Sequence, residues 1–229
     1  SNNYIEQVIG LTTDLDDVSA KLFGLTTNGG SEFCGAVIGE SLDKLSWSAS
    51  ITDLKMIYIA GNEPFNQGPV AFETVCKKAL AKGVFINTIY CGEYNQGVRE
   101  FWKQGATCSE GDYFNIDSDK AIVHVDTPYD VQINTFNDSL NTTYLGYGVN
   151  RISKKANHTT QDANAGAMSQ EAVTERSIVK SKKAAYNNAS WDLVDAADNG
   201  LKIEDIKEEE LPDEFKGKTT EEKKVLIEE

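Results

Sequence analysis

The sequence predicts an α/β protein with a doubly wound, mostly parallel sheet and a C-terminal α-helical extension. Two short apolar runs, 54–60 and 84–90, are rich in β-branched and aromatic residues, which predicts strands covered on both faces. Between them, apolar residues recur at helical spacing over 70–80, and Gly83 ends the pattern. A strand, a helix and a strand in this order form a βαβ unit, whose strands are parallel and whose crossover is right-handed.

The residues before this unit predict one strand and two helices. Residues 4–11 alternate imperfectly and are rich in β-formers, which indicates a strand at a sheet edge. Asp14 can cap a helix that continues to residue 25, and a second helix is expected over 32–46. The loop between these helices contains two glycines, which permit close approach of the backbone to another group.

The residues after the unit divide into the end of the α/β domain and a helical extension. Residues 98–104 predict a helix, and 112–116 predict a last short strand. We assign 1–126 to the α/β domain and 127–229 to the extension with its acidic tail. An apolar face repeats every three or four residues over 129–144, which predicts a long amphipathic helix.

The rest of the extension is mostly polar. Residues 154–183 are alanine-rich and predict either one helix or a helical hairpin. An apolar island around Trp191 and Leu193 is expected to anchor the extension to the α/β domain. Thr219 and Glu222 have the spacing of a capping box, which predicts a final helix.

The charge of the chain limits its partners. The formal net charge of −14 argues against nucleic acid and against an anionic membrane surface, because both favour patches of Lys and Arg. No window is long and apolar enough for a transmembrane segment. Composition therefore argues against these two classes of partner and identifies no other.

The cysteines and histidines give no metal-site spacing. Cys34 and Cys76 lie on predicted helical apolar faces and are expected to be buried thiols, whereas a bridge between Cys91 and Cys108 is geometrically conceivable. The two histidines, at 124 and 158, are expected at the surface. Zinc binding requires closer ligand spacing and more histidine than this chain has.

The best candidates for a binding site are the loops that follow the predicted strands, because ligands of open parallel sheets gather at the carboxyl ends of the strands. With the loop after the first helix, these positions are Gly29, Gly30, Ser31, Glu32, Gly61, Asn62, Glu63, Cys91 and Gly92. Among them, Ser31, Asn62 and Glu63 carry oxygen atoms that suit a hard cation such as Mg²⁺ or Mn²⁺. The alternative interpretation is that both loops are simple turns with helix-capping side chains.

At these loops the sequence resembles a known family. The order of its elements is similar to the later two-thirds of a bacterial von Willebrand factor A domain. These elements are a helix, a Gly-Gly-Ser loop, a helix, Trp47, a buried strand, Gly-Asn-Glu-Pro at 61–64, a helix and the strand within 83–92. The similarity covers roughly residues 4–117. In addition, 188–196 and 209–212 resemble the C-terminal extension of a bacterial subgroup of these proteins.

The resemblance implies a doubly wound, Rossmann-like α/β module that binds a protein ligand, often through a metal-ion-dependent adhesion site. Ser31 matches the threonine of that site, although a shifted alignment places Phe33 there instead. The expected aspartate falls on Gly61 or Asn62, so its carboxylate is missing, and the Asp-x-Ser-x-Ser part with its N-terminal strand is absent. The resemblance thus implies a degenerate or absent metal site and a sheet that lacks its N-terminal part, which a partner can complete.

The favoured function is a non-enzymatic protein-interaction module that binds a protein ligand at the loops on the carboxyl edge of the sheet. The resemblance also suggests an exported bacterial protein, periplasmic or at the cell surface, with a lipoprotein as one form. An alternative is a Rossmann-like small-molecule-binding or hydrolytic enzyme, but the sequence has no GxGxxG, P-loop or GxSxG motif. A carboxylate pair within 14–17 is more simply explained as helix capping.

A third possibility is a structural or oligomerisation protein that acts through the helical arm, residues 129–229. A dimer in solution would favour this possibility.

Overall fold

The computed structural model describes residues 5–26, 30–117, 120, 125 and 127–228 of the 229-residue chain. Contacts between residues divide the chain into two compact units. The α/β unit comprises Ser1–Leu11 with Thr26–Val123, and the helical unit comprises Thr12–Leu25 with His124–Glu229. The expected division at residue 126 differs from this one in the segment Thr12–Leu25, which we had placed in the α/β domain.

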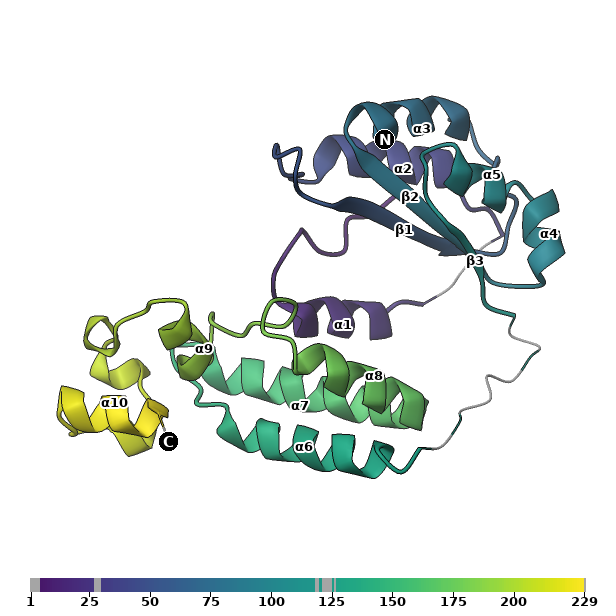
Figure 1. Ribbon diagram of the computed structural model, residues 1–229. Helices are drawn as coiled ribbons and strands as arrows, with labels where there is room; N and C mark the ends of the chain where they lie inside the picture. The colour runs from purple at the N-terminus through teal and green to yellow at the C-terminus, as the bar shows by residue number, and fades with distance from the viewer. Residues whose placement is uncertain (1–4, 27–29, 118–119, 121–124, 126, 229) are drawn as a thin grey trace. The chain divides into compact units, whose positions relative to one another are not determined.

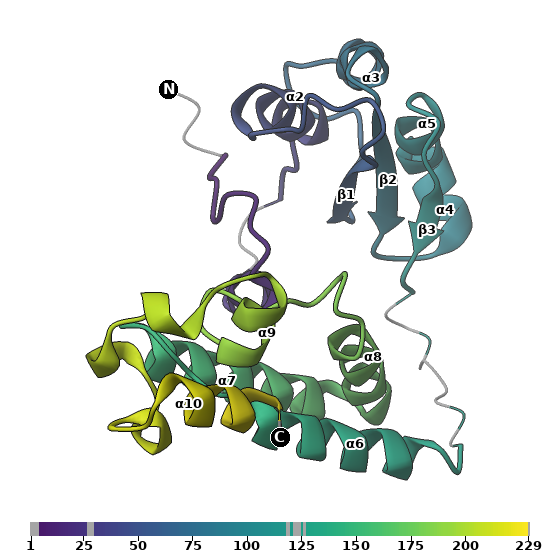
Figure 2. The ribbon, with the colours of Figure 1, turned by 60° about the vertical axis from the view of Figure 1, so that its left-hand side comes forward.

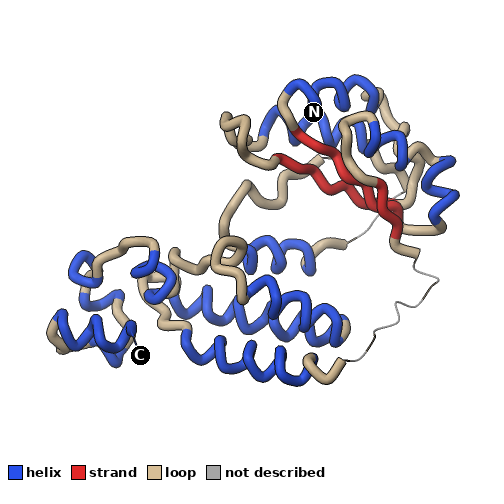
Figure 3. Tube along the Cα trace, in the orientation of Figure 1, coloured by secondary structure: helices blue, strands red, loops and turns tan. Residues whose placement is uncertain are grey.

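The α/β unit contains a three-stranded parallel sheet with the order β1-β2-β3 (Figure 3). Its strands are β1 (Lys55–Gly61), β2 (Val84–Tyr90) and β3 (Tyr113–Asn115). Helix α3 (Phe72–Ala81) connects the first two strands, so the predicted βαβ unit is confirmed. The protein is therefore of the mixed α/β class, with a parallel sheet compatible with a Rossmann-like arrangement.

Helices cover one face of this sheet. Helices α2 (Cys34–Lys44), α3 and α5 (Trp102–Thr107) lie on the same side of the strands (Figure 1). Their buried side chains form a core with the inward residues of β2. The members of this core are Cys34, Ile38, Leu42, Phe65, Phe72, Val75, Cys76, Ala79, Val84, Ile86, Tyr90 and Trp102. The single helix predicted over 98–104 is two helices, α4 (Tyr94–Arg99) and α5, because Phe101 adopts a left-handed φ of 68° between them.

The opposite face of the sheet is open. Met56, Tyr58 and Phe114 point to this face, and their side chains are 40%, 59% and 47% exposed. Lys55, Ile57 and Ile59 are half-buried, and the residues between them are exposed, so the prediction that this strand is covered on both faces is wrong. In the described part of the chain no strand pairs with the outer edge of β1.

The strand predicted over 4–11 is not formed by the residues that the structure describes. The described part of the predicted strand 4–11 has no regular secondary structure. Val8 and Leu11 are exposed there, so no buried face fixes a register for pairing.

The disulfide also differs from the predicted one. The bridge joins Cys76 to Cys108, with Cα atoms 5.7 Å apart, whereas Cys34 and Cys91 are free. Cys76 is on α3 and Cys108 caps α5, and these helices pack on the same face of the sheet. Cys91 follows β2 at an exposed position and is free, so the conceivable Cys91–Cys108 bridge is not formed. The expectation of a buried free thiol is wrong for Cys76, which is bridged, and agrees with the structure for Cys34.

The helical unit is built from six α-helices among the described residues. They are α1 (Leu15–Phe23), α6 (Asp130–Thr143), α7 (Arg151–Met168), α8 (Gln170–Lys180), α9 (Leu193–Asp198) and α10 (Thr220–Glu228). Helices α6, α7 and α8 lie side by side, and α1 packs against α7 (Figure 2). Three short 3₁₀ turns join α9 to α10: Ile203–Asp205, Glu208–Glu210 and Asp213–Phe215.

Local sequence signals explain several of these elements. Ser169 separates α7 from α8 and accepts a hydrogen bond from the Ala172 backbone N–H, so the predicted helical hairpin is confirmed. The capping box before α10 is also confirmed, because Glu222 accepts from the Thr219 N–H at 2.8 Å and Thr219 accepts from the Glu222 N–H at 3.3 Å. No helix in the described ranges combines the length and the apolar character that crossing a membrane requires.

The apolar island near residue 191 is buried inside the helical unit itself. Trp191 packs with Tyr144 and Tyr186. Leu193 belongs to a second cluster that gathers Ile203, Leu211 and Phe215 from the C-terminal turns. These two clusters form the apolar core of the unit.

Candidate functional site

The predicted binding loops meet at the carboxyl end of β1. The Glu32 carboxylate accepts hydrogen bonds from the backbone N–H groups of Asn62 and Glu63, with Oε2–N distances of 3.2 and 3.4 Å. Gly61 leaves room for this carboxylate: a Cβ there would overlap Glu32 Oε2 and lie 2.9 Å from the Trp102 ring. The loop at 30–32 is thereby attached to the loop at 61–63, as the sequence predicts.

Two residues outside the predicted set hold these loops. The Gln67 side chain accepts from the Glu32 backbone N–H at 2.9 Å and donates to Glu63 Oε2 at 3.3 Å. The Trp102 indole N–H donates to the Glu63 carbonyl oxygen at 2.8 Å. A glutamine four positions after Glu63 in a loop gave no recognisable signal in the sequence, and Trp102 was expected only as part of a helix.

Cys91 and Gly92 lie at the carboxyl end of the neighbouring strand. The backbone N–H of Cys91 donates to the Gly61 carbonyl oxygen at 2.7 Å, and Gly92 accepts from the Asn115 side chain at 3.0 Å. Partial burial, and then the negative charge of Glu32, raise the pKa of the Cys91 thiol. The structure therefore brings Cys91 into the same loop cluster. Gly29 lies outside the described residues.

The Glu32 carboxylate in this loop cluster is bound by backbone N–H groups rather than turned toward a cation. Backbone N–H groups surround the Glu32 carboxylate, and an N–H group cannot act as a metal ligand. Among the described residues, no group of three or more His, Cys, Asp or Glu side chains is arranged to hold a metal. Metal binding through Ser31, Asn62 and Glu63 stays a prediction, and we build no function on it.

A groove of about 300 Å³ runs beside the carboxyl half of β1. Its walls come from the N-terminal segment, the loop before α2, helix α2 and the strand. The lining residues are Ile5, Ser31, Glu32, Phe33, Cys34, Val37, Ile59 and Ala60. The predicted loop residues Ser31 and Glu32 thus border a groove that flanks the open edge of the strand.

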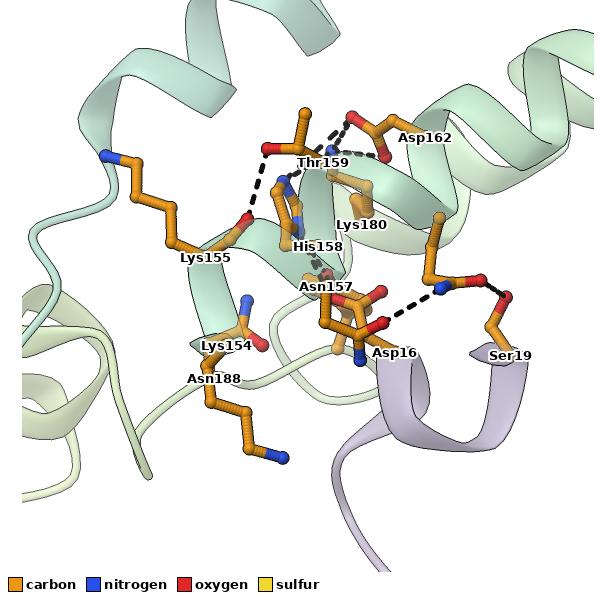
Figure 4. A network of polar contacts seen from close by, with 12 residues as sticks. Asp16, Ser19, Lys154, Lys155, Asn157, His158, Thr159, Asp162, Lys180 and Asn188 are labelled. Atoms are coloured by element: carbon orange, nitrogen blue, oxygen red, sulfur yellow. Dashed lines mark hydrogen bonds and ion pairs between the residues drawn. The ribbon is translucent and has the colours of Figure 1, made fainter. Parts of the chain in front are cut away.

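Several charged and polar side chains form a buried network in the helical unit, part of which Figure 4 shows. Its members are Asp16, Asn141, His158, Asp162, Arg176, Lys180 and Tyr186. They come from α1, α6, α7, α8 and the segment after α8. The expectation that His158 lies at the surface is wrong, because its side chain is 3% exposed.

Asp16 is held by three side chains. Arg176 Nη2 donates to its Oδ1 at 2.7 Å, and Tyr186 donates to its Oδ2 at 2.6 Å. His158 Nδ1 is 3.1 Å from the same Oδ2. Burial favours a higher pKa, but the hydrogen bonds from His158 and Tyr186 and the charge of Arg176 outweigh it, so the pKa of Asp16 is lowered to about 2.

Lys180 occupies the other end of the network, with no exposed side-chain surface. Its ammonium group donates to Asp162 Oδ2 at 2.9 Å and to Asn141 Oδ1 at 2.6 Å. Nζ also lies 3.2 Å from His158 Nε2. His158 Nε2 therefore faces both the Lys180 ammonium, which donates, and Asn141 Oδ1, which accepts, at 2.9 Å.

The charges of the network balance. Two carboxylates, Asp16 and Asp162, face two cations, Arg176 and Lys180. Despite burial, the Lys180 ammonium lowers the pKa of Asp162 far below its usual range, whereas burial lowers the pKa of Lys180. Buried charges are stable when paired and hydrogen-bonded in this way. The network therefore stabilises the packing of α1 against α7 and α8.

The carboxylates at 14–17 have separate roles. Asp14 caps α1 by accepting from the Asp17 backbone N–H at 3.0 Å, as predicted. Asp17 pairs with Lys154 rather than capping, and Asp16 enters the buried network. One signal of the network was present in the sequence: His158 and Asp162, like Arg176 and Lys180, are four positions apart, which places each pair on one helix face.

Comparison of the chain with family models, with curated proteins and with solved structures finds no match. The function must therefore be argued from the open sheet edge, the loop cluster and the buried network themselves.

Proposed function

We propose that this chain is a non-enzymatic protein-interaction module, similar to a von Willebrand factor A domain, whose α/β unit binds an extended segment of a partner protein along β1. The partner strand adds to the open edge of the sheet and continues past the loops at 30–32 and 61–63. The observation that carries this proposal is the outer edge of a seven-residue parallel strand, with which no strand of the described residues pairs, beside exposed apolar side chains.

The edge of β1 has the properties of an acceptor for another strand. Unpaired backbone groups along an edge form a template for pairing, and native proteins usually shorten or cover such edges. The opposite edge strand, β3, has three residues and contacts α4 and α5, whereas β1 has seven. Parallel sheets are normally covered on both faces, so the exposed side chains of Met56 and Tyr58 favour an additional covering layer.

The loop cluster supports recognition at the end of this edge. Hydrogen bonds from the Asn62 and Glu63 backbone N–H groups to the Glu32 carboxylate, and from the Glu32 backbone N–H to Gln67, fix the loop that carries Ser31 and Glu32. Loops fixed on a rigid scaffold lose little entropy on binding. The groove between α2 and Ile59 adds apolar surface where side chains of the added strand would lie.

An enzymatic function has less support. In the buried network His158, Asp16 and Lys180 already bind one another, so their hydrogen-bonding groups are occupied within the core. The loop cluster has no histidine among its described residues to serve as a base. The disulfide between Cys76 and Cys108 supports an extracytoplasmic location, because disulfides persist in oxidising compartments.

A peptide selection tests the proposal. A library of random peptides about ten residues long, close to the usual upper length of a strand, is selected on the immobilised full chain. We expect the selection to enrich peptides with alternating apolar residues. These peptides should bind the Tyr58→Lys variant at least tenfold more weakly than the parent chain. The added charge would lie directly beside an incoming strand on the open face, where it disfavours the burial of apolar side chains.

The matched control is Phe114→Lys. Phe114 is an exposed aromatic residue on the same face, but it lies on β3, two strands and about 10 Å from β1. Strand addition to β1 predicts unchanged binding to this variant. The absence of enriched peptides, or equal loss of binding in both variants, would refute the assignment to the β1 edge. Sedimentation of the free chain identifies a second copy as the partner if a dimer forms that Tyr58→Lys dissociates.

A further inference from the structure

The helical unit contains an apolar pocket of about 260 Å³ that is separate from the loops discussed above. It lies between α1, α7 and α8. Its apolar walls are formed by Leu15, Phe23, Ala165, Met168, Ala172 and Val179. Arg176 and Tyr186, two members of the buried network, also line it.

Arg176 offers hydrogen-bond donors that the described part of the protein does not use. Its Nε donates to Asp162 at 2.6 Å, and its Nη2 donates to Asp16 at 2.7 Å and to the His158 carbonyl oxygen at 3.4 Å. The described residues provide no acceptor for the N–H groups of Nη1. The Arg176 guanidinium carbon also lies 5.9 Å from the centre of the Tyr186 ring, which helps to fix its position.

From this combination we propose that the pocket binds a small, uncharged, largely apolar molecule that carries one hydrogen-bond acceptor, such as a ketone, an ester or an amide. The acceptor would accept hydrogen bonds from the Nη1 N–H groups of Arg176. The apolar part of the ligand would occupy the space between Phe23, Ala165 and Met168. Apolar pockets with a few fixed polar groups are the usual form of small-molecule sites.

Size and charge define the ligand class. The volume of about 260 Å³ exceeds the roughly 150 Å³ of an apolar cavity that holds benzene, so a benzene ring with one small substituent fits. The two cations of the network are already balanced by Asp16 and Asp162. An anionic ligand would add an uncompensated charge next to these carboxylates, so a neutral acceptor is favoured.

The test uses three probes of similar size on the full chain. Acetophenone has the required aromatic body and carbonyl acceptor, ethylbenzene lacks the acceptor, and benzoate replaces it by a carboxylate. Binding is followed by NMR shifts of the Met168 and Val179 methyl groups. We expect saturable shifts with acetophenone and about tenfold weaker binding of ethylbenzene, the difference that one hydrogen bond typically makes. Benzoate is also expected to bind more weakly than acetophenone.

Two variants locate the site. Ala172→Phe places a ring in the pocket and is expected to abolish the shifts, whereas Ala163→Phe, at an exposed position of α7 outside the pocket, leaves them unchanged. Circular dichroism verifies that both variants keep the helical content of the parent chain. Absence of acetophenone binding, or binding that survives Ala172→Phe, would overturn the site. Equal affinity for ethylbenzene, or tighter binding of benzoate, would overturn the role assigned to Arg176 and the uncharged ligand class.

Discussion

Asp16 and Arg176 form an ion pair with 2.7 Å between Oδ1 and Nη2, although 160 positions separate them in the sequence. The pair connects α1 to α8 inside the helical unit. The Asp16 side chain is 3% exposed, and the Arg176 side chain is 14% exposed. A carboxylate at such a position is stable only while its partners remain, so the packing of α1 depends on the network.

The first prediction concerns the charge of Asp16. The substitution Asp16→Asn leaves Arg176 and Lys180 with a single carboxylate between them. Breaking a buried ion pair from one side typically costs about 3–5 kcal/mol, and we expect a decrease of roughly 3 kcal/mol in the free energy of unfolding of the helical unit. Urea denaturation followed by circular dichroism measures this difference.

The control for this experiment is Asp198→Asn, in the same unit. Asp198 pairs with Lys183, and both side chains are more than half exposed. Solvent and salt screen such pairs, so no measurable change is expected. A loss of stability at Asp198 equal to that at Asp16 would contradict the role given to burial.

The second prediction is a loss of stability in acid. The pKa of Asp16 is about 2 in the folded protein, below its ordinary value of 3.8. A lowered pKa means that the stabilisation is fully present above about pH 4 and is lost as the pH falls through 2. The decrease in the pKa of Asp16 from 3.8 to about 2 corresponds to about 2 kcal/mol in the free energy of unfolding. The free energies of unfolding from urea titrations at about pH 5 and pH 2 should differ by at least this amount. The difference should be smaller in the Asp16→Asn variant.

The third prediction concerns Gly61. A Cβ at this position would overlap the Glu32 carboxylate and crowd the Trp102 ring. We expect Gly61→Ala to destabilise the α/β unit by about 1–3 kcal/mol, because the added carbon displaces the Glu32 carboxylate from the Asn62 and Glu63 N–H groups and crowds the buried Trp102 ring. The matched control is Gly30→Ala in the partner loop, where no atom lies within 4 Å of the added carbon. Thermal unfolding of both variants tests the difference, and equal melting temperatures would contradict the loop geometry.

The fourth prediction concerns the cysteines. Cys91 is exposed and free, so it should react with a thiol reagent in the native protein, slowly because its pKa is raised. Burial, with the charge of Glu32, raises the pKa of Cys34 to about 12, so this thiol should react only after unfolding. Cys76 and Cys108 should react only after reduction. Reaction of Cys76 in the unreduced, unfolded chain would contradict the bridge.

Local patterns predicted most secondary structure elements of this protein. The apolar runs at 54–60 and 84–90 match β1 and β2. Short apolar runs that are rich in β-branched and aromatic residues and lie next to glycine favour strands over helices. The capping box at Thr219 and the break before α8 also follow from adjacent residues. Residues 4–11 failed because a strand needs a partner and a buried face, which the local sequence does not encode.

The candidate site was predictable only in part. The rule that loops gather at the carboxyl ends of parallel strands accounts for the position of Gly61 but not for that of Glu32, because the loop at 30–32 precedes α2 and follows α1 rather than a strand. The Gln67 contacts, the Cys76–Cys108 bridge and the buried network depend on tertiary packing between distant segments. His158 illustrates the limit: its burial is decided by Asp16 and Tyr186, which lie 142 positions before it and 28 positions after it.

Hydrogen exchange along β1 tests the central claim most directly. In the free protein, the amides of β1 that point away from β2 should exchange rapidly, because no described strand pairs with that edge. With a peptide from the selection bound, the account predicts that these alternate amides become protected while those of β3 do not change. Protection at β3 or on the helices, with β1 unchanged, would contradict strand addition at this edge.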